Sequence, residues 1–208
     1  MLSNRQIDKI GEKLKTDTEL TTIELTHLLN WRNSFSPTLD YYEQRLKTKI
    51  DSNTVVAIAK RIKRIESIKI ELKRFSSMRL STLQDIAGLR VILKDKEKLE
   101  QAFTNIRVAE SFNRIKRLDN YHGDPKDDGY RGIHIVFQTS SSKLVEVQLR
   151  TQLQHVWATA VEVFATLLRS SFKTGGGDND WKEFFRYLST YLAIVEESPC
   201  LKEHQTYS

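Results

Sequence analysis

The sequence predicts an α+β fold in which a small mixed β-sheet is flanked by N-terminal and C-terminal helices. Apolar residues recur at helical spacing over about the first 50 residues, alternate with polar residues in the middle, and return to helical spacing after residue 150. Helices, then strands, then helices again is an order typical of α+β domains. We therefore divide the chain into an N-terminal helical segment (1–50), a central domain (51–172) and a C-terminal helix with a tail (173–208).

The N-terminal third is expected to be helical throughout. Residues 5–15 and 19–49 have helical spacing, and a break is expected near Ser36-Pro37 because proline rarely continues a helix. Residues 53–75 are predicted to form one strongly basic helix. The buried side of that helix is expected to consist of Val55, Val56, Ile58, Ile62, Ile65 and Ile68.

The middle of the chain is predicted to supply the sheet. Strands are expected at residues 89–93, 112–121, 133–138 and 144–149. The last two are separated by a Thr-Ser-Ser-Ser turn, which indicates an antiparallel hairpin. Asp95 is suited to cap a helix that runs to about Arg107.

The C-terminal part returns to helices. A long helix is expected from Thr151 to about Phe172, with a break at the glycines 175–177. A last helix should cover residues 180–197, followed by a frayed tail from Ser198. An apolar stripe on this last helix is expected to pack within the chain, with an interface between subunits as the alternative; it consists of Trp181, Phe184, Phe185, Leu188 and Leu192.

Composition limits the class of protein. Of the 208 residues, 39% are hydrophobic and 29% are charged, which allows a buried core and argues against global disorder. Cys200 is the single cysteine, so an internal disulfide and a cysteine-based zinc site are excluded. No apolar run approaches the roughly 18 residues that a membrane span needs. We expect a soluble, cytoplasmic protein without a membrane partner.

The net charge of +6 favours polyanionic partners such as nucleotides, RNA or DNA, although an ordinary basic protein can carry the same charge. Residues 60–79 contain eight basic and two acidic residues, so the net charge of this segment, eight minus two, equals the +6 of the whole chain. A solvated helix face is the plainer explanation. However, helical spacing would place Lys63, Ser67 and Glu71 on one face with Arg74 nearby, and such a face can bind a triphosphate.

Two acidic residues are candidate metal ligands. Asp85 stands at the entrance to a predicted strand, and Glu146 lies within another, where alternation puts Gln148 and Arg150 on its face. An ion pair with a nearby arginine would also explain Glu146. Two carboxylates on neighbouring strands facing a basic segment instead predict a Mg²⁺ site, because Mg²⁺ is commonly held by one or two carboxylates plus substrate phosphates.

A loop rich in glycine and proline, residues 120–132, connects two predicted strands. It is either an ordinary connection with Tyr130 packed on the core, or a base-binding loop in which Tyr130 stacks on a nucleobase and Lys126 meets a phosphate. His134 alternates with apolar neighbours and should point to the same side as Glu146, and His155 begins the following helix. A lone histidine is more often structural than catalytic, so these two count only as parts of a set.

Taken in order, these segments resemble the RelA/SpoT alarmone synthetase domain. The matching motifs are Arg61-x-Lys63-x-x-x-Ser67-Ile68, Asp85-Ile86-Ala87-Gly88-Leu89-Arg90, Pro125-Lys126-x-x-Gly129-Tyr130-Arg131-x-Ile133-His134, Glu146-Val147-Gln148-Leu149-Arg150-Thr151 and His155-x-Trp157-Ala158. They span about residues 55–165. The resemblance implies a nucleotidyltransferase-like sheet and a Mg²⁺-dependent transfer of the β,γ-diphosphate of ATP to the 3′-hydroxyl of GDP or GTP, with release of AMP.

The resemblance also implies roles for individual residues. Arg61 and Arg90 would sandwich the adenine of ATP, and Asp85 with Glu146 would be catalytic and carry Mg²⁺. The ATP phosphates would be held by Lys63, Ser67 and Lys69, with Lys73, Arg74 or Arg79. Tyr130 would stack on the acceptor base. The rest of the acceptor site would be lined by Lys126, His134, Gln148 and His155.

Departures from the family pattern leave the acceptor open. Asn120 stands where an aspartate is usual, which puts a preference for GDP or GTP in doubt, whereas Asp128 replaces an asparagine and suits the N–H groups of guanine. The histidines offer no counterpart to the family's hydrolase metal site, so a small stand-alone synthetase is expected. Alternatives are an adenosine alarmone, transfer to the 3′ end of tRNA by a toxin with an antitoxin partner, or an inactive nucleotide-binding module. Assembly into a homo-oligomer through the terminal helices is a further expectation.

Overall fold

A computed structural model describes residues 2–109, 114–168 and 179–207. The strands are β1 (Val55–Ile62), β2 (Ala87–Leu93), β3 (Ile115–Asn120), β4 (Ile133–Gln138) and β5 (Leu144–Thr151). The helices are α1 (Asn4–Lys15), α2 (Thr22–Asn33), α3 (Ser36–Lys49), α4 (Ile65–Arg74), α5 (Lys96–Val108), α6 (Gln152–Leu167) and α7 (Asn179–Val195). Short 3₁₀ segments cover Ser52–Thr54, Leu80–Thr82 and Lys202–Tyr207.

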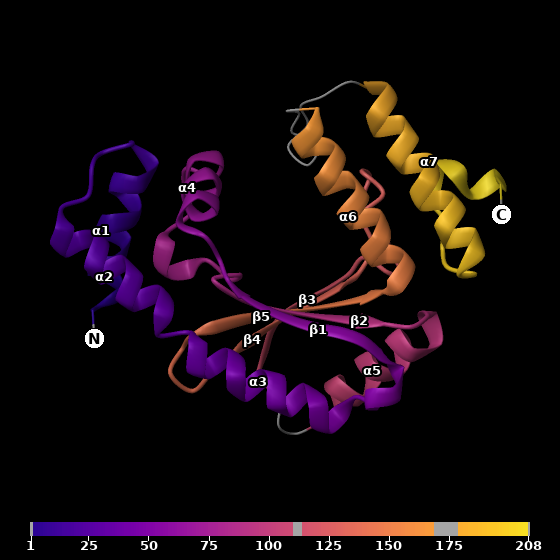
Figure 1. Cartoon of the computed structure of the whole chain (residues 1–208), viewed down its shortest axis with the longest axis horizontal. Coiled ribbons are helices and arrows are strands. Elements are labelled where there is room, and N and C mark those ends of the chain that lie inside the picture. Colours follow the sequence, from indigo (N-terminus) through magenta and orange to yellow (C-terminus); the bar gives the residue numbers. More distant parts are fainter. Residues whose placement is uncertain (1, 110–113, 169–178, 208) are drawn as a thin grey trace.

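The strands form one five-stranded mixed sheet with the order β1-β2-β5-β4-β3. β2 and β5 are parallel, and the other neighbouring pairs are antiparallel. Figure 1 shows α3 and α5 against one face of the sheet, with α4, α1 and α2 on one side of the other face and α6 with α7 on its opposite side. The predicted α+β class is confirmed.

The face that α3 and α5 cover is the apolar face, and it carries the main core. β5 alternates, so that Val145, Val147 and Leu149 are fully buried while the residues between them point to the other face. Phe137 of β4 stacks on Tyr42 of α3, with ring centroids 5.3 Å apart. Buried residues of α1 belong to the same core, so the N-terminal helices and the sheet pack as one unit.

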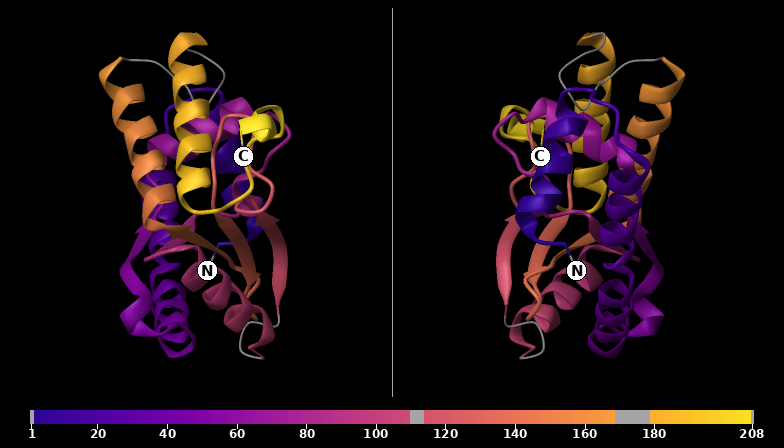
Figure 2. Two further views of the ribbon diagram at one scale, coloured as in Figure 1. Left: turned by 90° about the vertical axis from the view of Figure 1, so that its right-hand side faces the viewer. Right: turned by 90° about the vertical axis from the view of Figure 1, so that its left-hand side faces the viewer.

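The opposite face of the sheet is polar. In the strand register, Arg90 of β2 and His134 of β4 both pair with Gln148 of β5, and Glu146 of β5 pairs with Gly88 of β2. Paired residues point to the same face, so one row across the sheet carries an arginine, a glutamine and a histidine. This polar face carries the candidate site. Figure 2 shows α6 and α7 rising beside this face of the sheet.

The prediction of one basic helix over residues 53–75 is wrong. Residues 55–62 form the edge strand β1, and the helix begins only at Ile65. Of the six residues expected on its buried side, Ile68 is buried, whereas Val56 is 47% exposed. β-branched residues favour a strand, and an edge strand with a register shift between Val55 and Ala57 lacks clear alternation, so apolar spacing alone did not separate the two structures.

Most other predicted elements are confirmed. α1 is present, α2 and α3 are separated near Ser36-Pro37, Asp95 caps α5, and β4 and β5 form the antiparallel hairpin. The long helix begins after Thr151 but ends at Leu167. The glycines 175–177 and the start of the predicted strand 112–121 include residues outside the described ranges.

The tail is not frayed over its described length, contrary to expectation. Cys200, Leu201 and His204 are buried. The Lys96 ammonium donates to the carbonyl of Glu197 at 2.6 Å, which fixes the end of α7 to α5. None of the helices among the described residues is long and apolar enough to cross a membrane.

The junction between β5 and α6 gives a stability prediction. Thr151 Oγ1 accepts from the Gln154 amide at 3.1 Å, and the Gln154 side-chain oxygen accepts from the Thr151 amide at 3.2 Å. Replacing Thr151 with alanine should lower the free energy of unfolding by about 1–2 kcal/mol, because a helix N-cap is lost. Urea unfolding measures this. Thr159→Ala, at an exposed position of the same helix, should change it by less than about 0.5 kcal/mol, and equal losses would contradict the capping role.

Candidate active site

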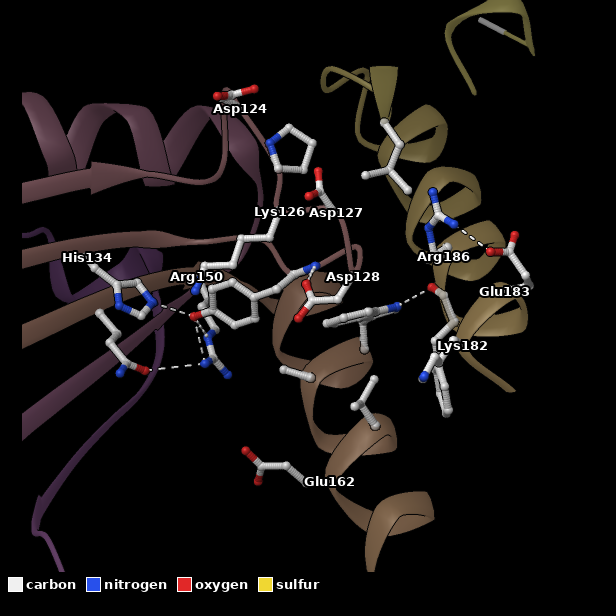
Figure 3. Close-up of a pocket in the computed structure, with 18 of the residues that line it drawn as sticks. Asp124, Lys126, Asp127, Asp128, His134, Arg150, Glu162, Lys182, Glu183 and Arg186 are labelled. Carbon is white, nitrogen blue, oxygen red and sulfur yellow. Dashed lines mark hydrogen bonds and ion pairs between the residues drawn. The ribbon is translucent and has the colours of Figure 1, made fainter. Parts of the chain in front are cut away.

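A pocket of about 960 Å³ lies over the polar face of the sheet. Its walls come from the loop 124–130, from α6 and from α7 with the tail, and Figure 3 shows that the charged side chains of the loop and of α7 approach it from opposite sides. Seven of the residues singled out from the sequence line it: Arg61, Arg90, Lys126, Asp128, Tyr130, His134 and Gln148. The structure therefore brings these seven residues together.

Tyr130 is the centre of a hydrogen-bond network on the floor of this pocket. Its hydroxyl lies 2.5 Å from His134 Nε2 and accepts from Arg150 Nη2 at 2.9 Å. Burial raises the pKa of the Tyr130 phenol, although Arg150 opposes that shift. The phenol is therefore neutral at pH 7 and can donate its proton to His134. These contacts hold the tyrosine ring in place.

Glu146 is joined to the same network. Its Oε1 lies 2.8 Å from His134 Nδ1, and its Oε2 accepts from the Gln148 amide at 2.8 Å. Burial raises the pKa of the Glu146 carboxyl, but the contacts with His134 and Gln148 and the charge of Arg61 outweigh burial, and the net pKa is below its usual value. Glu146 is thus ionised, and its direct partner is a histidine rather than the arginine that the simpler explanation expected.

Asp85 is held by a buried lysine. The Lys63 ammonium donates to both Asp85 and Glu71, and the Lys63 amide donates to the carbonyl of Ile86 at 2.9 Å. Burial lowers the pKa of Lys63, but Asp85 and Glu71 raise it by more, so the lysine stays charged. Lys63 therefore does not lie on the helix with Ser67, as spacing predicted; it precedes α4 and ties that helix to the entrance of β2.

The two candidate catalytic acids belong to neighbouring parallel strands: Asp85 lies just before β2, and Glu146 lies within β5. Gly88 pairs with Glu146, and Asp85 precedes Gly88 by three residues. Both carboxylates therefore approach the same end of the β2–β5 pair. Each has a polar partner: Asp85 forms an ion pair with Lys63, and Glu146 forms a hydrogen bond with His134.

The remaining residues expected to bind phosphate lie away from the pocket lining. Lys69 and Lys73 both pair with Asp17 in the connection between α1 and α2, and their hydrogen bonds lower the pKa of Asp17 to about 2. The other three, Ser67, Arg74 and Arg79, are exposed. His155 is half-buried beside the pocket, where burial and then the charges of Arg90 and Arg150 lower its pKa.

Several lining residues were missed from the sequence. Arg150 could have been included, because alternation already placed it on the face of Glu146. The wall that α7 and the tail supply could not be foreseen, since no local signal says which face of α7 meets the loop. The added lining residues include Arg150, Trp157, Glu162, Lys182, Glu183 and Arg186.

A comparison with protein families identifies the family of the chain. The family described as the region found in RelA/SpoT proteins matches residues 60–164, which is half of the chain. The chain belongs to the RelA/SpoT family. All five motifs lie in the matched range, so the resemblance noted in the sequence is confirmed.

Individual RelA/SpoT relatives are distant. An uncharacterized protein of Mycobacterium tuberculosis is 25% identical over 78% of this chain, and a GTP pyrophosphokinase of Bacillus subtilis is 30% identical over 52% of it. The chain spans 59% and 56% of the length of these two relatives. The structure of small alarmone synthetase 1 from Bacillus subtilis, bound to pppGpp, superposes with a TM-score of 0.67 at 23% identity, over 81% of this chain and 93% of that one. This likeness establishes the fold.

The loop that connects β3 to β4 contains a buried histidine, His122. Gln154 of α6 donates to His122 Nδ1 at 2.8 Å, so the imidazole is neutral and carries its proton on Nε2, which faces Glu100 at 3.5 Å. Burial lowers the pKa of His122, with Arg131 acting in the same direction and Glu100 opposing. This neutral histidine helps to join the loop to α6.

A pH dependence of stability follows. The pKa of His122 is 6.5 in the unfolded chain and lower in the folded protein. As the pH falls below 6.5, the unfolded chain therefore binds a proton at His122 before the folded protein does, which favours unfolding. The contribution of the neutral His122 to stability is thus complete above pH 6.5 and is lost as the pH falls through the folded pKa. The free energy of unfolding, measured in urea between pH 7.5 and 5, should therefore fall less steeply in His122→Gln than in the wild type. His27→Gln, which removes a half-exposed histidine, is the matched control, and a slope unchanged by the His122 substitution would contradict this assignment.

Proposed function

We propose that the chain transfers the β,γ-diphosphate of ATP to the 3′-hydroxyl of GDP or GTP, forming (p)ppGpp and AMP. The observation that carries the proposal is the network from Tyr130 through His134 to Glu146, under a pocket whose lining includes Arg61 and Arg90. Membership of the RelA/SpoT family supports this reaction class, and the low identity to each relative leaves the substrates as proposals.

Arg61 and Arg90 are proposed to bind the adenine of ATP. They lie on the neighbouring strands β1 and β2, in diagonal positions of the register, where two flat guanidinium groups can face one aromatic base. Arg90 Nε is buried without a hydrogen-bond partner among the described residues, which suits contact with a ligand. Lys63 is the buried phosphate candidate, whereas Lys69 and Lys73 would first have to release Asp17.

Mg²⁺ is the proposed cofactor, with Asp85 and Glu146 as its protein ligands. Carboxylate oxygens are the donors that a small, hard cation prefers. Among residues 2–109, 114–168 and 179–207, no group of three or more His, Cys, Asp or Glu is positioned for a metal, so phosphates and water would complete the coordination. When bound, the ion would neutralise charge on the transferred phosphates.

The acceptor is proposed to lie against the loop 124–130. Tyr130 offers an aromatic ring, and Asp128 lines the same pocket with a carboxylate that can accept from the N–H groups of guanine. Lys126 lies over the rings of Tyr121 and Tyr130, at 4.3 and 5.2 Å from their centroids, where its charge can meet an acceptor phosphate. His134, Gln148 and the nearby His155 would complete the site.

In the proposed reaction the ribose 3′-oxygen forms a bond to the β-phosphorus of ATP. The bond between that phosphorus and the oxygen bridging to the α-phosphate breaks, and the electron pair leaves with AMP. The proton of the 3′-hydroxyl passes to a base. Glu146 is ionised and bonds His134 and Gln148, which line the pocket, and this suits it to that role. Arg61 and Arg90 contribute by positioning, the main source of catalysis in phosphoryl transfer.

The second candidate uses the 3′ end of tRNA as the acceptor. The net charge of +6 and the exposed Arg64, Arg74 and Arg79 favour an RNA partner, and a toxin of this kind would have an antitoxin. We rank it second, because Asp128 and Tyr130 suit a free guanine nucleotide. An inactive module is the least favoured alternative, since both candidate catalytic acids are present. Assembly through the terminal helices stays a prediction.

An acceptor assay separates these candidates. Protein, Mg²⁺ and ATP labelled at the γ-phosphate are incubated with GDP, GTP, ADP or deacylated tRNA in separate reactions. Label should move to GDP or GTP, because the γ-phosphate stays in the transferred diphosphate, and a chelator should abolish the transfer. Label found in RNA alone would overturn the alarmone assignment.

Substituting the candidate acids tests the site itself. Glu146→Gln and Asp85→Asn should each lower transfer to any acceptor by about 10³-fold or more, because charge stabilisation in the transition state is lost. Circular dichroism and thermal melting should show a folded protein. Glu19→Gln removes one exposed carboxylate as the control and should leave the rate unchanged. Turnover near the wild-type rate in Glu146→Gln would refute the assignment.

A further inference from the structure

α7 contacts the acceptor loop through one buried hydroxyl group. Ser189 is 2% exposed, and its Oγ donates to the carbonyl of Gly129 at 2.6 Å. The same oxygen accepts from Nε of Arg131 at 3.1 Å. The hydroxyl therefore joins α7 to the backbone of Gly129 and to the side chain of Arg131, the two neighbours of Tyr130.

The close approach of the loop to α7 requires a glycine at position 129. Its φ of +89° is a conformation that L side chains rarely adopt. A Cβ at this position would lie 2.9 Å from Cβ of Ser189 and 3.2 Å from the Trp157 ring, so the loop backbone is pressed directly against α6 and α7. Within the loop, the Gly129 amide donates to the Lys126 carbonyl at 2.8 Å. The turn is thus closed on itself and packed against α7 at Ser189.

Arg131 fixes the direction of the serine hydroxyl. Its side chain is buried, and neither Nη atom has a hydrogen-bond partner among the described residues. Since the guanidinium can only donate, the Ser189 oxygen must accept from it and direct its own proton to Gly129. Trp157 Nε1 donates to the Phe185 carbonyl at 2.8 Å, which holds α7 beside α6 at this level.

We propose that Ser189 is a positioning residue for the acceptor. Its hydroxyl fixes Gly129, and Gly129 precedes the tyrosine whose ring is proposed to meet the acceptor base and whose hydroxyl reaches His134. Docking of α7 at Ser189 thereby sets the acceptor site, and the hydrogen bonds of Ser189 go to Gly129 and Arg131 rather than to the arginines proposed to bind ATP. The proposal rests on the function proposed above for the loop, and neither the sequence motifs nor the family match, which ends at residue 164, includes Ser189.

The neighbouring hydroxyl supplies a matched control. Thr190 is also buried on α7, but its Oγ1 bonds Nδ1 of His204 in the tail at 2.8 Å and does not contact the loop. Thr190→Val therefore removes one buried hydrogen bond from the same helix. If the substitutions act by loosening α7 in general, both should have the same effect. If Ser189 positions the loop, only Ser189→Ala should disturb the loop.

Two measurements on the full chain test the proposal. Hydrogen exchange followed by mass spectrometry should show faster exchange in peptides that cover residues 124–132 in Ser189→Ala than in Thr190→Val or the wild type. In the acceptor assay, Ser189→Ala should raise the KM for the acceptor by about tenfold, the equivalent of about 1.4 kcal/mol. Its KM for ATP should stay within a factor of about two.

Each outcome decides the proposal. Unchanged loop exchange in Ser189→Ala, equal effects of Thr190→Val, or a parallel rise in both KM values would overturn it. The exchange measurement needs no substrate, so it stands even if no acceptor is found and the proposed function fails. If Ser189→Ala does not fold because Arg131 loses its partner, the double variant S189A/R131M is compared with R131M alone, and faster loop exchange in the double variant is the supporting result.

Discussion

The ionised and mostly buried carboxylate of Glu146 is the constraint on which the site depends. A buried charge is costly unless polar neighbours compensate it. His134 and Gln148, which are paired on β4 and β5, each form a hydrogen bond with this carboxylate. Tyr130 in turn bonds His134, and Arg150 bonds Gln148. The need to satisfy one carboxylate thus orders a set of side chains from β4, β5 and the loop, and it leaves the tyrosine ring at the pocket surface.

The basic segment shows why counting charges overstates a binding site. Lys60 pairs with Asp40 and Glu43, Lys63 with Asp85 and Glu71, and Lys69 with Asp17. Much of the positive charge that stands out in the sequence is therefore used to attach β1 and α4 to the N-terminal helices and to β2. The cations that line the pocket include three arginines of the sheet, Arg61, Arg90 and Arg150, and others from the loop, α7 and the tail, so they come from distant parts of the chain.

The sequence was sufficient for elements with a strong local pattern. Alternation predicted β4 and β5, the cap at Asp95 predicted the start of α5, and the motifs predicted seven of the pocket-lining residues. β1 was mistaken for a helix, because an edge strand shields neither face fully and its apolar spacing is ambiguous. The contributions of α7 and of the buried tail were missed for a different reason. They depend on which surfaces meet after folding, and Ser189 has no local signal that marks it as a neighbour of Gly129.

The parallel pairing of β2 and β5 has a consequence for how the molecule acquires its activity. The chain must pass through α5, β3 and β4 before β5 can align beside β2, so this contact closes a long loop and is expected to form slowly. Asp85 and Glu146 become neighbours only in that step. A nascent chain that has formed its N-terminal helices and first strands therefore does not yet hold the two candidate catalytic acids at one end of a strand pair, and the site is completed only when β5 joins the sheet.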